Sequence, residues 1–190
     1  EHILAKDKML YRLIKADRLS SIILYGPPGC GKTSLARVIS NTTKCKFLKI
    51  NAVTSGISDI KNAVETAQNA LLNPSGKCIL FIDEINCVSE TLAPVMLQFL
   101  QAKMFGNTKV PDGWIIVAAG NPPEYNKSVR DFDMVTLDRV RYISIEADYD
   151  VWKEYAISKH IHPMILSYLE LKPTNFYKVS TSVDGMEFVT

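Results

Sequence analysis

Short apolar runs alternate along this chain with longer segments whose apolar residues recur every three or four positions. The short runs are typical of buried strands, whereas the recurring spacing is typical of helices with one apolar face. Runs that are apolar on both faces, such as residues 78–82, belong in the middle of a sheet covered on each side. The expected strands cover residues 21–25, 45–51, 78–82, 114–119 and 141–145, and the expected helices cover 4–16, 32–41, 57–71 and 89–102. This order predicts an α/β fold with a doubly wound, five-stranded parallel sheet.

The last part of the chain follows a different pattern. Residues 151–160 and 163–171 are both expected to be helical with no strand between them, and a short β-like stretch comes after them. Earlier in the chain, residues 103–110 resemble a hairpin. We therefore expect a core domain over residues 1–148 and a partial helical lid or C-terminal extension over residues 149–190.

Composition narrows the class of protein. The chain has 190 residues, 47% of them apolar and 22% charged, which suffices for one good core and a small appendage. Its formal net charge of +2 gives no global sign of a protein that binds polyanions, although it leaves a local basic patch open. The basic residues of segment 4–16 are expected on a solvated helix face.

Cysteines and apolar runs bear on where the protein works. None of the four cysteines belongs to a Cys-x-x-Cys pair, which favours a set of reduced thiols. No apolar run approaches the roughly 20 residues that span a bilayer, and no charged and apolar leader opens the sequence. His160 and His162 lack an acidic or cysteine companion at metal-site spacing. A cytoplasmic protein without a membrane partner is therefore expected.

A glycine-rich turn lies between the first expected strand and the helix after it. Its sequence GPPGCGKT, from Gly26 to Thr33, fits the phosphate-loop pattern G-x-x-x-x-G-K-[ST] at every fixed position. Glycines let backbone N–H groups point inward, and the helix N-terminus adds a positive dipole. Lys32 would reach the β- and γ-phosphates of a nucleotide, and Thr33 would bind Mg²⁺. The residues expected around the phosphates are Gly26, Pro27, Pro28, Gly29, Cys30, Gly31, Lys32, Thr33 and Ser34.

Two other interpretations of this turn explain less. A dinucleotide-binding loop needs a third glycine where Ser34 stands, and it has no role for Lys32 and Thr33. A merely structural turn does not account for a strand, glycines, a lysine and a threonine in this order. Cys30 occupies a variable position of the pattern, which favours a filling role over a redox switch.

Two carboxylates follow the buried strand at residues 78–82. Parallel sheets bind ligands at the carboxyl ends of their strands, which is where these two side chains are expected. Asp83 can hold the Mg²⁺ shell, and Glu84 can polarise the attacking water. On their own, acidic residues after a strand are as typical of a helix N-cap. The phosphate loop earlier in the chain favours the catalytic interpretation.

Polar residues near the last two strands complete the candidate site. Asn121 follows strand 114–119 and would orient the water or bind the γ-phosphate, although a turn-forming role before Pro122 is an alternative. Arg139 and Arg141 lie at the start of the last strand, where each fits a surface ion pair or an arginine finger for a neighbour's nucleotide. Arg139 is the preferred finger, and the strand pattern does not separate it from Arg141.

With these motifs in this order, the chain resembles the AAA+ ATPases over nearly all its length. Residues 1–84, which include EHILAKDKMLYRLIKADRLSSIILYGPPGCGKT and KINAVTSGISDIKNAV, resemble the replication-associated recombination ATPase RarA. Residues 83–190, which include DEINCVSETLAPVMLQFLQ and PDGWIIVAAGNPPEYNKSVRDFDMVTLDRV, resemble a MoxR-type AAA+ ATPase. The shared DEI is where the two halves meet. A natural mosaic, a chimera and a relative of both would each explain the split.

The resemblance implies ATP as the nucleotide and gives a role to each matching position. It implies a phosphate loop at Gly26, Gly29, Gly31, Lys32 and Thr33, a second motif at Asp83 and Glu84, a sensor at Asn121 and a finger at Arg139. The family's adenine-reading residues are expected before Glu1. Its lid arginine has no counterpart after Arg141.

The expected function is Mg²⁺-dependent ATP binding and hydrolysis in a homo-oligomeric ring that remodels a partner. The RarA-like half indicates a replication fork, and the MoxR-like half indicates a protein complex. A protein partner is therefore expected, and DNA stays open because no segment resembles a DNA-reading helix. The alternative function is a nucleotide-gated binding module with little turnover, because the adenine-reading and lid residues are missing.

Overall fold

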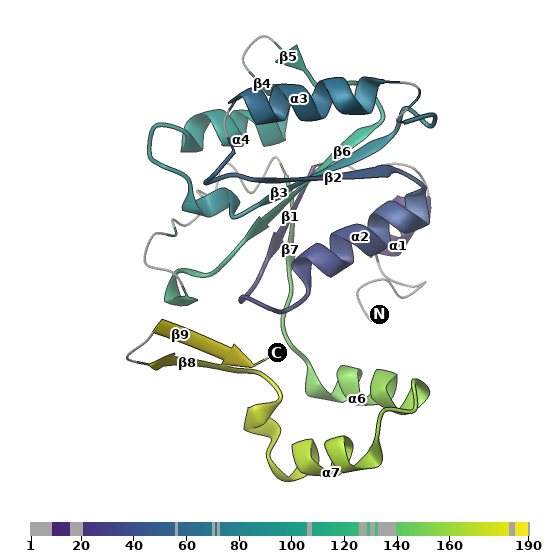
Figure 1. Ribbon diagram of the computed structural model, residues 1–190, viewed down its shortest axis with the longest axis vertical. Helices are drawn as coiled ribbons and strands as arrows, with labels where there is room; N and C mark the ends of the chain where they lie inside the picture. Colours follow the sequence, from purple (N-terminus) through teal and green to yellow (C-terminus); the bar gives the residue numbers. More distant parts are fainter. Residues whose placement is uncertain are drawn as a thin grey trace. The chain divides into compact units, whose positions relative to one another are not determined.

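The structure is a computed structural model of the chain (Figure 1). It describes residues 9–15, 21–55, 57–69, 71, 73–105, 108–125, 129, 132, 140–182 and 185–189. The chain divides into two compact units: unit 1 extends to Ile145, and unit 2 runs from Glu146 to Thr190. The expected boundary between residues 148 and 149 falls inside unit 2, close to its start.

Unit 1 alternates strands with helices. Its strands are β1 (Ile22–Tyr25), β2 (Lys46–Asn51), β3 (Cys78–Asp83), β4 (Met104–Phe105), β5 (Thr108–Lys109), β6 (Trp114–Gly120) and β7 (Arg141–Ser144). Its α-helices are α1 (Met9–Lys15), α2 (Lys32–Thr43), α3 (Ile57–Gln68) and α4 (Ala93–Ala102), and its short 3-10 helices are η2 (Ile85–Cys87) and η3 (Pro123–Tyr125).

Five of these strands form one sheet in the order β2-β3-β6-β1-β7, and every neighbouring pair is parallel. The order places β1 between two strands from the second half of the chain, with Ile22 paired to both Val117 and Arg141. β4 and β5 form the separate hairpin that residues 103–110 predict. The predicted α/β fold with a five-stranded parallel sheet is confirmed.

Helices cover both faces of the sheet (Figure 1). On one face, α3 and α4 bury Val64 and Phe99 against the even-numbered side chains of β3, such as Leu80. On the other face, α1 and α2 bury Leu10 and Ile39 against the odd-numbered ones, such as Ile79 and Phe81. Successive strand residues point to opposite faces, so a strand covered on both sides is apolar throughout. This is why β3 and β6 appear in the sequence as unbroken apolar runs.

Helices α3 and α4 are both shorter than predicted, and side-chain hydrogen bonds explain where α3 ends. Asn73 Nδ2 donates to Ala67 O at 2.9 Å, and Leu71 N donates to Asn69 Oδ1 at 2.9 Å. These contacts give the backbone partners outside the helix. Helix α3 therefore ends at Gln68, and Leu71 is 91% exposed. At the start of α4 the contacts are between backbone groups: Leu92 N and Ala93 N both donate to Ser89 O at 3.0 Å, so Ser89–Leu92 forms a turn and α4 begins at Ala93.

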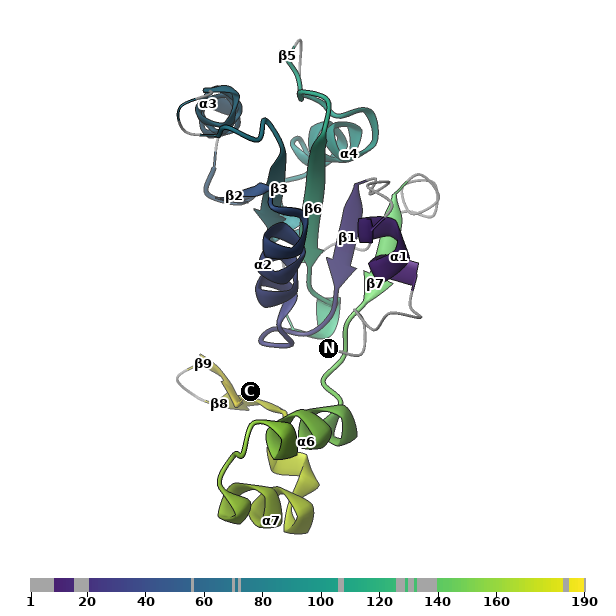
Figure 2. The same ribbon diagram turned by 90° about the vertical axis from the view of Figure 1, so that its right-hand side faces the viewer.

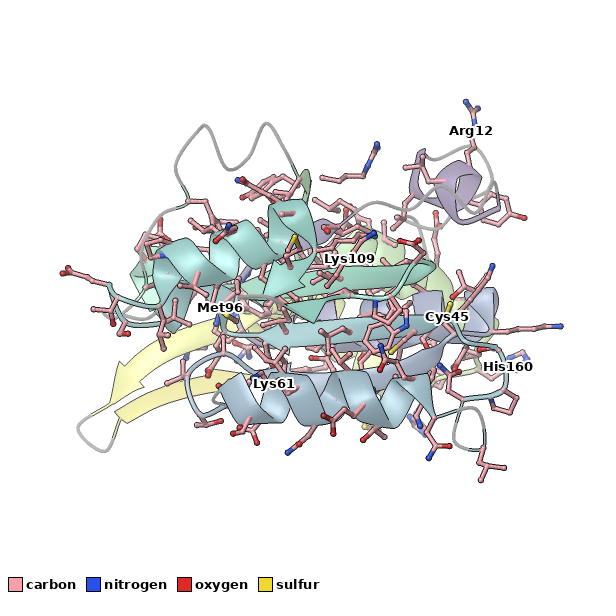
Figure 3. All side chains as sticks on the ribbon, turned by 90° about the horizontal axis from the view of Figure 1, so that it is seen from above. Arg12, Cys45, Lys61, Met96, Lys109 and His160 are labelled. Carbon is pink, nitrogen blue, oxygen red and sulfur yellow. The ribbon has the colours of Figure 1, made fainter. Side chains whose placement is uncertain are left out.

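The basic segment near the start of the chain is described from Met9 to Lys15, as α1. Arg12 is exposed, and its side chain points away from the body of unit 1 (Figure 3). This position agrees with the solvated face expected for that helix.

Unit 2 contains α6 (Tyr149–Ser158) and α7 (Pro163–Leu171), which Figure 2 shows as a helix pair. Asp148 caps α6 by accepting from Val151 N at 3.1 Å, and Lys153 pairs with Glu170 across the two helices. The 3-10 helix η4 (Pro173–Asn175) and the hairpin β8 (Lys178–Ser182) and β9 (Gly185–Val189) follow. The two predicted helices are confirmed, and their assignment to a lid stays a prediction. None of the helices described is long and apolar enough to cross a bilayer.

Candidate nucleotide site

The candidate site lies at the carboxyl ends of the three central strands. β1 runs into the glycine-rich turn, β3 ends at Asp83, and β6 ends at Gly120, just before Asn121. Because these strands are parallel neighbours in the order β3-β6-β1, their carboxyl ends meet at one edge of the sheet. Segments that are about 90 residues apart in sequence therefore share this edge.

The glycine-rich turn leads directly into the N-terminus of α2. Gly29 and Gly31 have φ angles of 76° and 90°, in the left-handed region that glycine adopts readily. Gly31 precedes the helix without a side-chain cap, and the first helical bond is Leu35 N to Gly31 O at 2.8 Å. The N–H groups of the first turn precede that bond, so they are available to an anion at the positive end of the helix.

Gly26 begins the turn at a point of close backbone contact. A Cβ atom there would lie 2.0 Å from Ile145 O, so no side chain fits at this position. Gly26 N also donates to Gly120 O at 3.3 Å. The first glycine of the pattern is therefore required by the packing of the turn against the ends of β6 and β7.

Lys32 joins the turn to the end of β6. Its Nζ donates to Gly26 O and Pro27 O, both at 2.7 Å, and to Asn121 Oδ1 at 2.9 Å. The residue is only 8% exposed. Burial lowers the pKa of Lys32 below its ordinary value, and the nearby Cys30 and Asp83 offset part of that effect. The ammonium group is thus held by weakly basic oxygens, which a phosphate can replace as a stronger partner.

Each of the two carboxylates contacts a residue of β2. Asp83 Oδ2 lies 2.7 Å from Lys49 Nζ, and the two side chains are 24% and 44% exposed. Glu84 Oε2 accepts from Asn51 Nδ2 at 2.8 Å. Glu84 also has a left-handed backbone, with φ 55° and ψ 38°. A non-glycine residue in this conformation costs free energy, and such residues are concentrated at functional sites.

Asn51 holds its side-chain amide in a fixed orientation. Its Oδ1 accepts from Val53 N at 2.9 Å and from Thr54 N at 3.2 Å, so the carbonyl oxygen faces the turn after β2. The Nδ2 group is left to face Glu84. Lys49 and Asn51 were not among the residues expected at the site. The sequence feature that could have indicated Asn51 is its position as the last residue of a strand, at the edge of the sheet where the site lies.

Asn121 is the predicted sensor, and a second asparagine contacts it. The side chain of Asn86, in η2, donates to Asn121 O at 2.8 Å and accepts from Asn121 N at 3.2 Å. Asn86 was not predicted, because the sequence does not show that η2 returns beneath the end of β6. The alternative role for Asn121, as a turn residue alone, does not account for its bond to Lys32.

The donor set fits a magnesium ion shared with phosphates. Thr33 lies in the first turn of α2, and Asp83 is the last residue of β3. A hydroxyl and one carboxylate are oxygen ligands of the kind that Mg²⁺ uses together with phosphates and water. Among the described residues, no group of three His, Cys, Asp or Glu could hold a metal without such help.

The remaining expected residues divide into described and undescribed ones. Arg139 lies outside the described residues. Arg141 begins β7, paired with Ile22 at the amino end of β1, and therefore lies away from the phosphate loop of its own chain.

Burial raises the pKa of the Cys30 thiol above its ordinary value, although Lys32 lowers it in part. His162, which lacks companions at metal-site spacing, caps α7 by accepting a hydrogen bond from Met164 N at 3.2 Å.

The chain shares sequence with proteins of known family. Replication-associated recombination protein A of Bacillus subtilis is 40% identical over 104 residues, which are 55% of this chain and 24% of that protein. The protein of the same name from Escherichia coli is 40% identical over 101 residues, 53% of this chain and 22% of that protein. The chain thus spans about a quarter of the length of these relatives.

Two further comparisons extend over most of the chain. An uncharacterized Thermotoga maritima protein is 24% identical over 196 residues, covering 98% of this chain and 33% of that protein. A variant of Thermotoga maritima RuvB matches the structure with a TM-score of 0.58 and 17% identity, over 82% of this chain and 48% of that one. The second similarity concerns the fold alone.

The model of the ATPase family associated with various cellular activities (AAA) matches residues 22–137. That range contains the glycine-rich turn, both carboxylates and Asn121. It covers more than half of the 190 residues. This chain belongs to the AAA family of ATPases.

Proposed function

We propose that this chain is the nucleotide-binding core of a Mg²⁺-dependent ATPase that uses hydrolysis to remodel a partner. The observation that carries the proposal is the position of Lys32, which contacts both the glycine-rich turn and Asn121. A buried ammonium group at the N-terminus of a helix is suited to the β- and γ-phosphates of ATP. The phosphates would replace Gly26 O and Pro27 O as its partners.

Thr33 and Asp83 would hold the metal in this proposal. When bound, Mg²⁺ supplies positive charge to the phosphate oxygens during transfer. Lys49 occupies Asp83 Oδ2 in the structure, so Asp83 must exchange this ammonium for the metal or share the carboxylate between them. The N–H groups at the start of α2 bind the phosphates and orient them toward the carboxylates.

Glu84 would polarise the attacking water. A carboxylate that accepts from Asn51 has one lone-pair direction occupied, so it must turn away from Asn51 or use its second oxygen. Asn121, fixed beside Lys32, would orient the water or contact the γ-phosphate. These assignments make Glu84 the general base and Asn121 a residue that aligns the reacting groups.

A homo-oligomeric ring with a finger from the neighbouring subunit is the second part of the proposal. Arg139 is assigned to this role from its place in the sequence, with Arg141 as the alternative. Its test mixes Arg139→Ala with Lys32→Ala subunits, each inactive alone. The proposal expects partial recovery of hydrolysis, because a mixed ring places an intact arginine beside an intact lysine. No recovery from subunits that co-assemble by light scattering would contradict it.

The partner is proposed from the two resemblances of the sequence. The matching relatives are named for replication-associated recombination, which supports replication-fork DNA and its proteins as the partner. The cytoplasm is the proposed location, as expected from the sequence. The MoxR-like half supports a protein complex instead. A pull-down with forked DNA, compared with linear duplex of equal length, separates these two: selective retention on the fork supports the first partner.

A binding module with little turnover is a second candidate, and one observation favours it. Both carboxylates contact side chains of their own chain, Asp83 through Lys49 and Glu84 through Asn51. A site held in this way would bind a nucleotide and hydrolyse it slowly.

Single-turnover hydrolysis decides between the two candidates. The unchanged chain is compared with Glu84→Gln, and with Glu65→Gln on the exposed face of α3 as the matched control. The ATPase proposal expects turnover in the unchanged chain and in the control, and a loss of about 100-fold or more in Glu84→Gln with ATP binding retained. Equal rates in all three would assign Glu84 a structural role. Binding without turnover in the unchanged chain would favour the module.

A further inference from the structure

We propose that Asn86 is a positioning residue that holds Asn121 in register with Lys32, and thereby links the segment after Glu84 to the phosphate-binding lysine. This inference rests on the proposed ATPase function, and it assigns a role to a residue that touches neither nucleotide nor water in that proposal. Asn86 lies in η2, two residues after Glu84, and is only 5% exposed.

The contact between the two asparagines has two hydrogen bonds in opposite directions. Asn86 Nδ2 donates to Asn121 O at 2.8 Å, and Asn86 Oδ1 accepts from Asn121 N at 3.2 Å. One short side-chain amide therefore satisfies both backbone groups of the residue that follows β6. Backbone groups that lose their partners in a partly buried site cost free energy, so the two bonds restrain the position of the Asn121 backbone.

The chemistry of this contact is specific to a short side-chain amide. A carboxylate at position 86 would accept but not donate, and would face Asn121 O with like partial charge. An alanine would leave both backbone groups of Asn121 without these partners. The same network assigns the oxygen and nitrogen of the Asn86 side chain. In the reverse orientation Oδ1 would face the acceptor Asn121 O, and Nδ2 would face the donor Asn121 N.

Gly120 provides the space in which Asn86 lies. A Cβ atom at Gly120 would be 3.0 Å from Asn86 Oδ1 and 3.2 Å from its Cγ. Both distances are shorter than nine in ten contacts of a Cβ atom, so a side chain at position 120 would require Asn86 to shift by a few tenths of an ångström. The absence of a side chain at Gly120 thus leaves the space that the Asn86 side chain occupies.

The contact continues from Asn121 to the phosphate loop. Asn121 Oδ1 accepts from Lys32 Nζ at 2.9 Å, and Lys32 donates in turn to Gly26 O and Pro27 O. A row of hydrogen bonds therefore runs from η2 through Asn121 and Lys32 to the turn. In the proposed function the phosphates bind Lys32 and the N–H groups at the start of α2, and these groups belong to the glycine-rich turn and its helix. Nucleotide binding should therefore depend on Asn86 less than the reaction does.

The test is a double-mutant cycle of Asn86→Ala and Asn121→Ala, with Asn62→Ala on the exposed face of α3 as control. We expect Asn86→Ala to lower kcat by about tenfold while the Kd of a nonhydrolysable ATP analogue changes by less than about threefold. The double variant should be no slower than Asn121→Ala alone, because both changes remove the same alignment. Effects that multiply would overturn the proposal, as would a rise in Kd that accounts for the whole loss of activity.

Two additions keep the outcome clear. Asn86→Ser retains one small polar group and serves as a second variant in case Asn86→Ala folds poorly. Its kcat should lie between those of Asn86→Ala and the unchanged chain. Hydrogen exchange gives a reading without turnover: the Asn121 amide should exchange faster in Asn86→Ala than in the unchanged chain or in Asn62→Ala. Unchanged exchange would overturn the proposal, whereas absence of hydrolysis in the unchanged chain would count against the ATPase function instead.

Discussion

Asn51 Nδ2 donates to Glu84 Oε2 at 2.8 Å, and this bond ties the last residue of β2 to the carboxylate that follows β3. The two residues are 33 positions apart, and the parallel pairing of Asn51 with Asp83 brings them together. The candidate base is therefore held from an edge strand, on the side away from the phosphate loop in the strand order.

Removing this bond should change the reaction and leave binding alone. We expect Asn51→Ala to raise basal hydrolysis about two- to fivefold, because a net hydrogen bond of about 1 kcal/mol no longer competes with water for Glu84. The Kd of a nonhydrolysable analogue should stay within twofold. Steady-state hydrolysis measures the first effect and calorimetric titration the second. A fall in kcat would show that Asn51 aligns Glu84 for the reaction instead of holding it back.

Lys32 should be essential for nucleotide binding. In Lys32→Ala, the buried cation that faces the turn is lost, and we expect the affinity for a Mg²⁺-bound nonhydrolysable ATP analogue to fall at least about 100-fold. Lys61→Ala, on the exposed surface of α3, is the matched control and should bind normally. Calorimetric titration measures both. Undiminished affinity in Lys32→Ala would refute the phosphate-loop assignment.

Two glycines should respond differently to the same methyl group. In Gly26→Ala the new Cβ meets Ile145 O at 2.0 Å, so the backbone must move, at a cost of about 2–3 kcal/mol in the free energy of unfolding. In Gly76→Ala nothing lies within 4 Å, and only the φ of +65° opposes the change, at about 1 kcal/mol.

Thermal unfolding followed by circular dichroism compares the two variants. At about 2–4 °C per kcal/mol for a chain of this size, Gly26→Ala should lower Tm by roughly 4–12 °C and Gly76→Ala by roughly half as much or less. Equal shifts would mean that the turn relaxes freely around position 26.

Cys30 should be slow to react despite its place in the turn. Burial raises the pKa of its thiol above the ordinary value, so the thiolate fraction at pH 8 is smaller than for an ordinary cysteine. We expect alkylation by iodoacetamide at pH 8 to be slower than in the urea-unfolded chain, and to need a higher pH than an ordinary cysteine to reach the same rate. Mass spectrometry of the peptide that contains Cys30 follows the modification. Labelling at pH 7 as fast as in the unfolded chain would contradict the raised pKa.

Much of the fold could be predicted, because it depends on local patterns. The buried runs at residues 78–82 and 114–119 correspond to β3 and β6, and their apolar character on both faces follows from helices on both sides. The end of α3 could not be predicted, because Asn69 and Asn73 compete for backbone groups through contacts that spacing does not reveal. The strand order likewise depends on long-range pairing.

The candidate site likewise contains residues that could be predicted from the sequence and residues that could not. Lys32, Asp83 and Glu84 belong to contiguous motifs, so their types and spacing were enough to single them out. Lys49, Asn51 and Asn86 contact residues from other segments of the chain. Lys49 reaches Asp83 because β2 and β3 are adjacent and in register, and Asn86 reaches Asn121 because η2 turns back toward β6. Such contacts depend on tertiary structure, which one sequence does not display.

The strand order also has a consequence for how the protein is made. β1 lies near the start of the chain, yet its two neighbours in the sheet are β6 and β7. A nascent chain that ends before Gly120 already contains GPPGCGKT, but it has neither Asn121 to contact Lys32 nor Ile145 to pack on Gly26. Long-range pairing is slow, and it forms late in folding. Affinity for the nucleotide should therefore arise near the end of translation of unit 1, when β6 and β7 close around β1, and not when the motif itself leaves the ribosome.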